Sequence, residues 1–369
     1  MRIGPLALTP SIALTDVGID SNVFNTWDNP QSDFTMTLKP QGDAWFRMGR
    51  ARFTTHASLG LVYFHQFHQE RSANTDDSVR LDLPFTHVRP WASLSYLSTR
   101  DRPGFEIDAR ARRTETRPAI GLDLPLAAKT TFTVAVRRNR IRYASDAVFL
   151  GTYLRETFDR RVDSVTASLR YRLTPLTTAV VYVDRERQRF TFSPGRDSNS
   201  VEVMPGLEFG TFALLSGRAH VGYRTMNMIA AEIPDYRGVV ADVDLAYTLL
   251  GMTRFAVQAE RDIQYSFEIQ QPYYVLTGVS GSLSQHLFGS WDIVARGGRQ
   301  RLAYQQVAAF AQSTAGRTDT VNSYGAGIGY RLGRDVRLGF DVNQYRRHSV
   351  YSQRDYKALR IGTSVTYGF

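Results

Sequence analysis

The chain has 369 residues, 43% of them hydrophobic, and it contains no cysteine. The lack of thiols excludes a disulfide scaffold, a thiolate zinc site and a cysteine nucleophile, and since no apolar run approaches about 18 residues, a transmembrane helix is excluded as well. The formal net charge is +10, and every basic residue except Lys39, Lys129 and Lys357 is arginine or histidine. These arginines alternate with acids along the whole chain instead of forming a patch, which argues against a nucleic-acid partner.

One pattern repeats from the first segment to the last. Stretches of roughly 10–15 residues alternate apolar and polar side chains with period 2. In chain order, the clearest stretches are residues 51–63, 162–173, 238–249 and 359–369. In the second stretch, Val165 and Leu169 lie on one face, and Ser168 and Arg170 lie on the other. The alternation predicts β-strands with one apolar and one polar face.

The connections between these stretches alternate between short and long. Short turns are predicted at residues 48–50, 127–129, 174–177, 251–253, 288–290 and 333–335. Longer polar links are predicted at residues 21–32, 68–76, 98–110, 145–157, 193–199, 229–234, 306–316 and 348–354. At roughly twenty residues per strand, we expect about eighteen strands, more than a twisted open sheet usually holds.

The fold class expected from these patterns is all-β. A closed sheet pairs every backbone polar group, which the hydrocarbon interior of a membrane requires. Short turns on one side and long loops on the other are typical of outer-membrane barrels. We therefore predict one domain over residues 1–369, a transmembrane antiparallel outer-membrane β-barrel with short periplasmic turns, long extracellular loops and both termini in the periplasm.

Aromatic residues gather near both ends of the predicted strands. Those beside the short turns are Trp45, Phe46, Trp91, Phe132, Tyr171, Tyr247, Phe255, Trp291 and Tyr330. Those toward the long loops are Tyr63, Tyr96, Phe190, Tyr236, Tyr265, Tyr273, Tyr304, Tyr345 and Tyr356. Because amphipathic rings favour the two membrane interfaces, we expect two girdles of rings around the barrel.

The end of the chain and several internal segments resemble known proteins. Phe369, with Tyr367 two residues earlier, resembles the terminal signal of bacterial outer-membrane barrels. Over its whole length the chain resembles the β-barrel porin family encoded in exopolysaccharide synthesis and export clusters of Gram-negative bacteria. The segments that carry this resemblance are LALTPSIALTDVGIDSNVFN (6–25), DRPGFEIDAR (101–110), LTPLTT (173–178) and QPYYV (271–275). The resemblance implies an outer-membrane conduit for a secreted polysaccharide.

Motifs for enzymatic chemistry are weak. Residues 278–282 (GVSGS) miss the last position of the nucleophile-elbow pattern and lie inside a predicted strand. Residues 325–329 (GAGIG) resemble a phosphate loop, but no helix follows, and the three glycines share one strand face where they would leave a smooth strip. His65 and His68 have ligand-like spacing without an adjacent carboxylate. We expect no enzyme, no catalytic residue, no metal site and no cofactor.

The polar face of each strand predicts which charged side chains line the lumen. The predicted cations are Arg52, Arg80, Arg113, Arg117, Arg170, Arg172, Arg218, Arg224, Arg254, Arg296, Arg337 and Arg360. The predicted anions are Asp82, Asp123, Asp242, Asp244, Glu260 and Asp341. About half of these charges are expected to pair across strands. The excess of guanidinium groups, with Arg170, Arg172, Arg218 and Arg224 as its main cluster, would attract anions into the lumen.

A second basic set lies at the long-loop ends of the predicted strands. It comprises the arginines of residues 137–142 and 185–189 together with Arg346 and Arg347. Those that point outward are expected to meet the phosphates of the outer leaflet. The expected partners are therefore a polysaccharide substrate, outer-membrane lipid and lipopolysaccharide, and a periplasmic export protein.

We expect passive transport across the bacterial outer membrane, with export of an acidic or otherwise polar exopolysaccharide as the leading interpretation. A general anion-preferring diffusion porin is the alternative within transport. An outer-membrane enzyme and a structural or adhesive barrel are the alternatives from other classes. The sequence does not identify the sugar.

Overall fold

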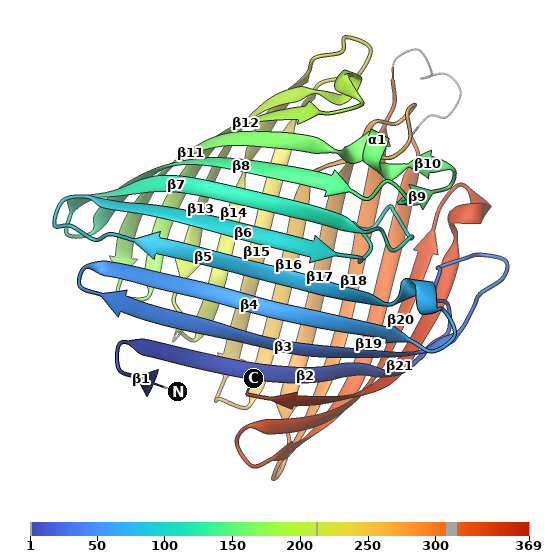
Figure 1. Ribbon diagram of the computed structural model, residues 1–369, viewed down its shortest axis with the longest axis horizontal. Helices are drawn as coiled ribbons and strands as arrows, with labels where there is room; N and C mark the ends of the chain where they lie inside the picture. Colours follow the sequence, from blue (N-terminus) through green and yellow to red (C-terminus); the bar gives the residue numbers. More distant parts are fainter. Residues whose placement is uncertain (1, 212, 308–315, 369) are drawn as a thin grey trace.

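A computed structural model describes residues 2–211, 213–307 and 316–368, and its strands form one closed antiparallel barrel (Figure 1). The prediction of about eighteen strands is confirmed, since the barrel has 18. These are β2 (Leu6–Asp20), β3 (Asp33–Met48), β4 (Ala51–Phe64), β5 (Ser72–Asp82), β6 (Arg89–Thr99), β7 (Arg113–Ala127), β8 (Thr130–Tyr143), β11 (Arg160–Thr174), β12 (Thr177–Phe190), β13 (Ser198–Phe209), β14 (Leu215–Met228), β15 (Tyr236–Leu249), β16 (Thr253–Tyr265), β17 (Tyr273–His286), β18 (Trp291–Gln305), β19 (Thr318–Leu332), β20 (Val336–His348) and β21 (Tyr356–Tyr367).

Smaller elements decorate the two ends of the barrel. The two-residue strand β1 (Arg2–Ile3) pairs with the start of β2. The β8–β11 loop carries the hairpin β9 (Val148–Phe149) and β10 (Thr152–Tyr153), followed by α1 (Leu154–Phe158). Short 3-10 turns lie in other loops at η1 (His68–Glu70), η2 (Pro194–Arg196) and η4 (Ser352–Arg354). No helix in the described ranges is long and apolar enough to cross a membrane.

The barrel closes where β2 pairs with β21, its most distant strand in sequence. Asp20 lies opposite Arg360 there, and Ala13 lies opposite Thr366. A bulge interrupts β2 near Asp16, which has a φ of 55°. Beside the bulge, a Cβ built on Gly18 would lie 1.9 Å from the carbonyl oxygen of Ile361. The two strands can therefore approach at this point only because residue 18 has no side chain.

Turns and loops alternate around the barrel as the sequence predicts. The short turns and both chain ends lie together at one end, along the left and bottom of Figure 1, and the described long loops lie at the other. Gly49 and Gly333 take positive φ values of 58° and 67° in two of the short turns, a conformation that glycine adopts without steric cost. Phe369, expected to end the last strand, lies outside the described residues.

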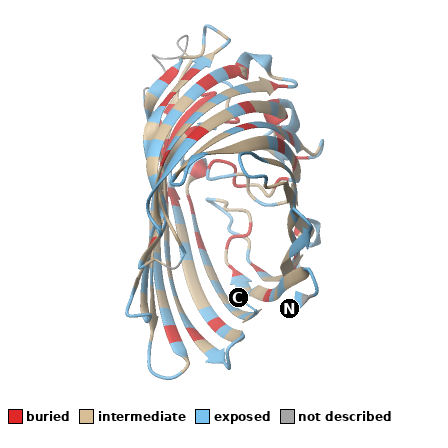
Figure 2. Ribbon diagram, turned by 90° about the vertical axis from the view of Figure 1, so that its left-hand side faces the viewer, coloured by how far each residue is buried: buried red, intermediate tan, exposed pale blue. Residues whose placement is uncertain are grey.

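Each strand has one outward and one inward face. On β11, Val165, Leu169 and Tyr171 are exposed, whereas Ser164 and Ser168 on the opposite face are buried. The buried face is the inward one, because the equivalent face of β20 contacts a loop that lies inside the barrel. Figure 2, which views the barrel from the end with both termini, shows chain segments within the ring of strands.

The aromatic residues follow this division only in part. At the short-turn end, Phe46 pairs with Phe53, and Trp291 pairs with Tyr330, on outward faces as expected for a girdle. Trp45 and Trp91, by contrast, occupy inward registers. The second girdle is wrong for most of its members, because Phe190, Tyr236, Tyr273, Tyr304 and Tyr356 are buried. Their rings pack among the loops instead of facing lipid.

Replacement of Gly18 by alanine tests the close approach at the β2–β21 seam. The added methyl group would meet backbone atoms of β21, and overpacking of this kind costs roughly 1–3 kcal/mol. We expect G18A to unfold at a lower temperature in detergent, measured by the loss of heat-modifiable gel mobility. G60A is the matched control, because the nearest atom to its new Cβ is 3.7 Å away. Equal unfolding temperatures for the two variants would contradict this account of the seam.

Candidate functional site: the lumen, its mouth and its outer plug

The structure places all the predicted lumen residues on inward faces of the barrel wall. Strand register puts Arg52 opposite Asp82, Arg218 opposite Asp244, and Arg296 opposite Gly325 on this side. The same register holds for Arg80, Arg113, Arg117, Arg170, Arg172, Arg224, Arg254, Arg337, Arg360 and Asp242. Their role along a substrate path stays a prediction.

Most of these arginines are held in ion pairs. Arg80 binds Asp82 at 2.8 Å, Arg296 binds Asp341 at 2.9 Å, and Arg360 binds Asp20 at 2.8 Å. Arg337 binds Asp292, and Arg113 and Arg117 share Glu115. Such pairs compensate partly buried charge. The pairs of Arg296, Arg337 and Arg360 join different strands, whereas those of Arg80 and Glu115 lie within a single strand. The guanidinium groups involved are less available to a solute.

The cluster predicted to attract anions is largely neutralised. Arg170 contacts Glu208 at 3.2 Å, Arg218 contacts Asp242 at 2.9 Å, and Arg224 contacts Asp262 at 3.0 Å. Among the described inward residues of β12–β16, the acids are Asp184, Glu186, Glu202, Glu208, Asp242, Asp244, Glu260 and Asp262, and the arginines are Arg218, Arg224 and Arg254. The prediction of an inward excess of cations is therefore wrong for this wall, which is acidic.

The three glycines of residues 325–329 do not leave a smooth strip. A Cβ on Gly327 would lie 2.3 Å from Oδ1 of Asp341, and one on Gly329 would lie 2.3 Å from a guanidinium nitrogen of Arg337. The side chains of neighbouring strands thus lie over the glycines. The glycines make room for the ion pairs of Arg296 and Arg337.

A cavity at the short-turn end of β2–β6 has a different charge balance. We call this cavity, of about 1090 Å³, the mouth pocket. Its charged and aromatic lining includes Arg2, Arg47, Arg52, Arg89, Trp45, Asp82 and Asp123. Asp82 forms an ion pair with Arg80, and Asp123 accepts hydrogen bonds from Trp91 and Thr133. Both carboxylates of the pocket are therefore already engaged.

The arginines of the mouth pocket are correspondingly free. Arg52 and Arg89 form neither an ion pair nor a side-chain hydrogen bond within the described part of the chain, and Arg47 donates only to the Gly49 carbonyl. Arg47 and Arg52 lie opposite each other on β3 and β4, so two like charges share the pocket wall. Trp45, which is 43% exposed, presents its ring beside them. The pocket can accept an anionic group next to an apolar ring face.

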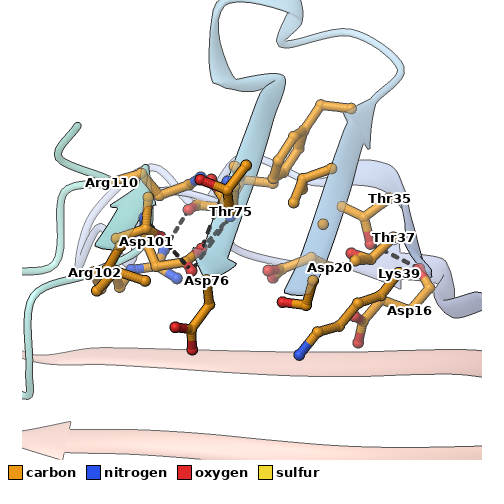
Figure 3. Close-up of a pocket in the computed structure, with 18 of the residues that line it drawn as sticks. Asp16, Asp20, Thr35, Thr37, Lys39, Thr75, Asp76, Asp101, Arg102 and Arg110 are labelled. Atoms are coloured by element: carbon orange, nitrogen blue, oxygen red, sulfur yellow. Dashed lines mark hydrogen bonds and ion pairs between the residues drawn. The ribbon is translucent and has the colours of Figure 1, made fainter. Parts of the chain in front are cut away.

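A second cavity, the inner chamber of about 580 Å³, lies farther along the same wall toward the long loops. Figure 3 shows Asp20, Lys39, Asp76 and Arg102 around it. Lys39 and Asp76 have no ion-pair partner among the described residues. The ammonium and guanidinium groups can donate hydrogen bonds to the hydroxyl groups of a sugar, and the carboxylates can accept hydrogen bonds from them.

The β6–β7 loop, residues 100–112, folds into the lumen above the inner chamber, and we call it the outer plug. Arg347 reaches it from β20, which lies six strands around the barrel from β6. One of its guanidinium nitrogens donates to the Phe105 carbonyl at 3.0 Å and to the Asp108 carboxylate at 3.1 Å. Its other terminal nitrogen binds Asp319 at 2.6 Å. These buried contacts hold the outer plug across the lumen.

Glu106 lies at the centre of the outer plug and is 2% exposed. Ser266 Oγ donates to its carboxylate at 2.6 Å, and the backbone N–H of Phe267 donates to it at 3.1 Å. Next to it, Ile107 packs against Leu154 and Phe158. Burial raises the pKa of Glu106 to about 7, although these hydrogen bonds and nearby Arg354 oppose the shift.

Sequence reasoning missed the residues that distinguish the two cavities. The lumen-facing position of Arg47 could have been predicted, because Asp43, Trp45 and Arg47 alternate on the polar face of β3. Lys39 belongs to the same alternation. Apart from the length of its loop, no local sequence pattern indicated that the outer plug folds into the lumen. In the described ranges, no group of three or more His, Asp or Glu residues is placed to hold a metal ion.

Comparisons with protein families and with solved structures relate the chain to known proteins. A family model described as "Putative beta-barrel porin 2" matches residues 1–369. Among solved structures, the outer membrane protein opdK from Pseudomonas aeruginosa matches with a TM-score of 0.51 and 9% identity, covering 98% of each chain. A BenF-like porin from Pseudomonas fluorescens Pf-5 matches with a TM-score of 0.52 and 9% identity, covering 99% of this chain and 98% of its own. No curated protein matches. At this identity the structures show the fold alone.

The buried carboxyl group of Glu106 predicts a pH-dependent plug. Its pKa is about 7 in the packed plug against an ordinary value of 4.5, so the packed state binds the proton more tightly than a released loop does. The packed state is therefore favoured most below pH 4.5 and loses this advantage as the pH rises through 7. We expect the conductance of single channels in planar bilayers to increase between pH 5 and pH 8. E106Q, which cannot ionise, should flatten the profile, and an unchanged profile in E106Q would refute this role.

Proposed function

Since the chain belongs to the Putative beta-barrel porin 2 family, we propose that this outer-membrane channel exports an acidic polysaccharide that enters through the mouth pocket. The outer-membrane location and the porin-like barrel follow from the family match and the fold. The identity of the cargo is the part that we propose.

The free arginines of the mouth pocket are the observation that carries this proposal. Arg52 and Arg89 face a cavity in which both carboxylates are already hydrogen-bonded. A guanidinium group offers fork-shaped donors that match a carboxylate or sulfate on a sugar chain. The ring of Trp45 beside them supplies an apolar surface for the face of a sugar ring. Charge and shape together suit an acidic sugar better than a small inorganic anion.

The position of the pocket favours export. Short turns and chain ends mark the periplasmic end of an outer-membrane barrel, and the mouth pocket lies at that end. A polymer delivered from the periplasm would meet these arginines first and the mixed charges of the inner chamber next. A periplasmic protein that delivers the polymer would dock around the same rim.

A general anion-preferring diffusion porin is the second candidate, because free arginines at the mouth would also concentrate small anions. The outer plug argues against it. A diffusion porin benefits from a lumen that is open at rest, whereas Arg347 and Asp108 tie a loop across this one. An exporter can keep such a loop in place until the polymer displaces it.

Block of the channel current by acidic oligosaccharides tests the proposal. Oligomers of glucuronic acid added on the short-turn side should reduce the current through the wild-type channel. R52Q/R89Q should weaken this block roughly tenfold, because two charge-assisted contacts are lost. Uncharged glucose oligomers of equal length should block both channels to a similar extent.

R334Q is the control for a charge change at the same end of the barrel, since Arg334 is exposed in the β19–β20 turn. Its block constant should equal that of the wild type. If R52Q/R89Q also matches the wild type, the mouth pocket does not bind acidic sugar and the export proposal loses its basis. Free passage of the acidic oligomers without block, together with high chloride selectivity, would favour the diffusion porin.

A further inference from the structure

A groove on the outside of the barrel, at the long-loop ends of β12–β14, is not part of the channel. We call this cavity of about 490 Å³ the basic groove. It is lined by Arg185, Arg187, Arg189, Asn199, Thr225 and Asn227, among others. The three arginines alternate on β12 and share the face of Val181 and Val183, which are exposed to the outside. In register, Arg187 lies opposite Asn199, and Asn199 lies opposite Asn227.

The charges around the basic groove are almost all positive. Arg138, Arg140 and Arg161 occupy the adjoining outward positions of β8 and β11. On the described outward faces of β8 and β11–β14, the single carboxylate is Asp163, which is already bound by Arg138 and by Arg161. Within the groove, Arg189 is also near the Asp197 carboxylate, at 3.7 Å. The remaining arginines still give the basic groove a local excess of positive charge.

Two of its arginines are free, and the third organises the groove. Arg185 and Arg187 form neither ion pairs nor side-chain hydrogen bonds with other described residues. Arg189 donates to the Ser198 carbonyl at 2.9 Å and to the side-chain oxygen of Asn199 at 2.8 Å. These bonds hold Arg189 and Asn199 in place. The amide nitrogen of Asn199 is left to donate to a ligand.

The position of the groove along the barrel axis indicates which part of the membrane lies next to it. Below it, toward the short turns, the outward residues Val181, Val183, Val203, Val221 and Tyr223 are apolar and exposed. The change from valine to arginine along β12 therefore marks the boundary between hydrocarbon and headgroups. At the long-loop end of an outer-membrane barrel, this boundary belongs to the outer leaflet.

We propose that the basic groove binds a phosphate group of lipopolysaccharide in the outer leaflet. Arg185 and Arg187 would each present two parallel N–H donors to phosphate oxygens, as guanidinium groups do. Asn199 and Asn227 would donate to the remaining phosphate oxygens or to the sugar that carries them. The acyl chains would lie on the valines below. The channel's cargo plays no part in this proposal, so it stands whether or not the export proposal does.

Binding of lipid A by the purified barrel tests the proposal, with native mass spectrometry in a neutral detergent as the measurement. Bis-phosphorylated lipid A should bind the wild type. Dephosphorylated lipid A with the same acyl chains should bind at least roughly tenfold more weakly. R185Q/R187Q should bind the phosphorylated form as weakly as the wild type binds the dephosphorylated form. R185K/R187K, which keeps the charge and removes the fork, should fall between the two.

R299Q/R301Q is the matched control. Arg299 and Arg301 are also exposed, outward-facing and near the long-loop end, but they lie on β18 and outside the basic groove. Retained lipid A binding by R299Q/R301Q would assign the site to the groove. Equal losses in both double variants would show a diffuse charge effect and overturn the proposal, as would wild-type binding by R185Q/R187Q. Heat-modifiable gel mobility confirms that each barrel is folded, and single R187Q replaces any double variant that is not.

Discussion

The need to pair every backbone N–H and C=O in hydrocarbon governs this structure. The sheet meets it by closing β21 onto β2, where Gly18 lets two backbones approach closely. Closure then forces each strand to present one face to lipid and one to the lumen. The charges that this chain carries must therefore lie inside, in loops or at the membrane boundary.

Inside the barrel, the cost of burying charge determines which groups remain available. Arginines with acids on neighbouring strands, such as Arg218 and Arg296, are tied into the wall. Among the residues that the structure describes, Arg52 and Arg89 lack such partners, because the carboxylates nearby are already bonded. Free positive charge thus collects at the periplasmic mouth. At the other end, the same pairing between Arg347 and Asp108 holds a loop across the lumen. The lumen therefore has free arginines at its short-turn end and a loop tied across its long-loop end.

The period-2 alternation predicted the strands and the direction of their lumen-facing arginines, because these depend on local geometry alone. The closed barrel was inferred from the number of strands and the alternation of short turns and long loops. The pairing of the arginines was not predictable, since Arg170 meets Glu208, 38 residues away, and Arg224 meets Asp262, also 38 residues away, only after the strands have registered. The outer plug was hidden for the same reason. Glu106 contacts Ser266, 160 residues later in the chain, and no local pattern marks that contact. The buried tyrosines near the long loops were mistaken for a girdle, because an aromatic residue at a strand end gives the same sequence pattern whether lipid or a loop covers its ring.

We propose that this barrel carries an acidic polysaccharide out of the periplasm. The most direct measurement is to delete its gene in the source bacterium and to quantify acidic polysaccharide in the medium and in the periplasm. If the barrel exports the polymer, deletion should remove the polymer from the medium and make it accumulate in the periplasm. Secretion should return when the wild-type gene is restored but not when R52Q/R89Q is supplied. Unchanged secretion in the deletion strain, together with slower uptake of small anions, would contradict the proposal.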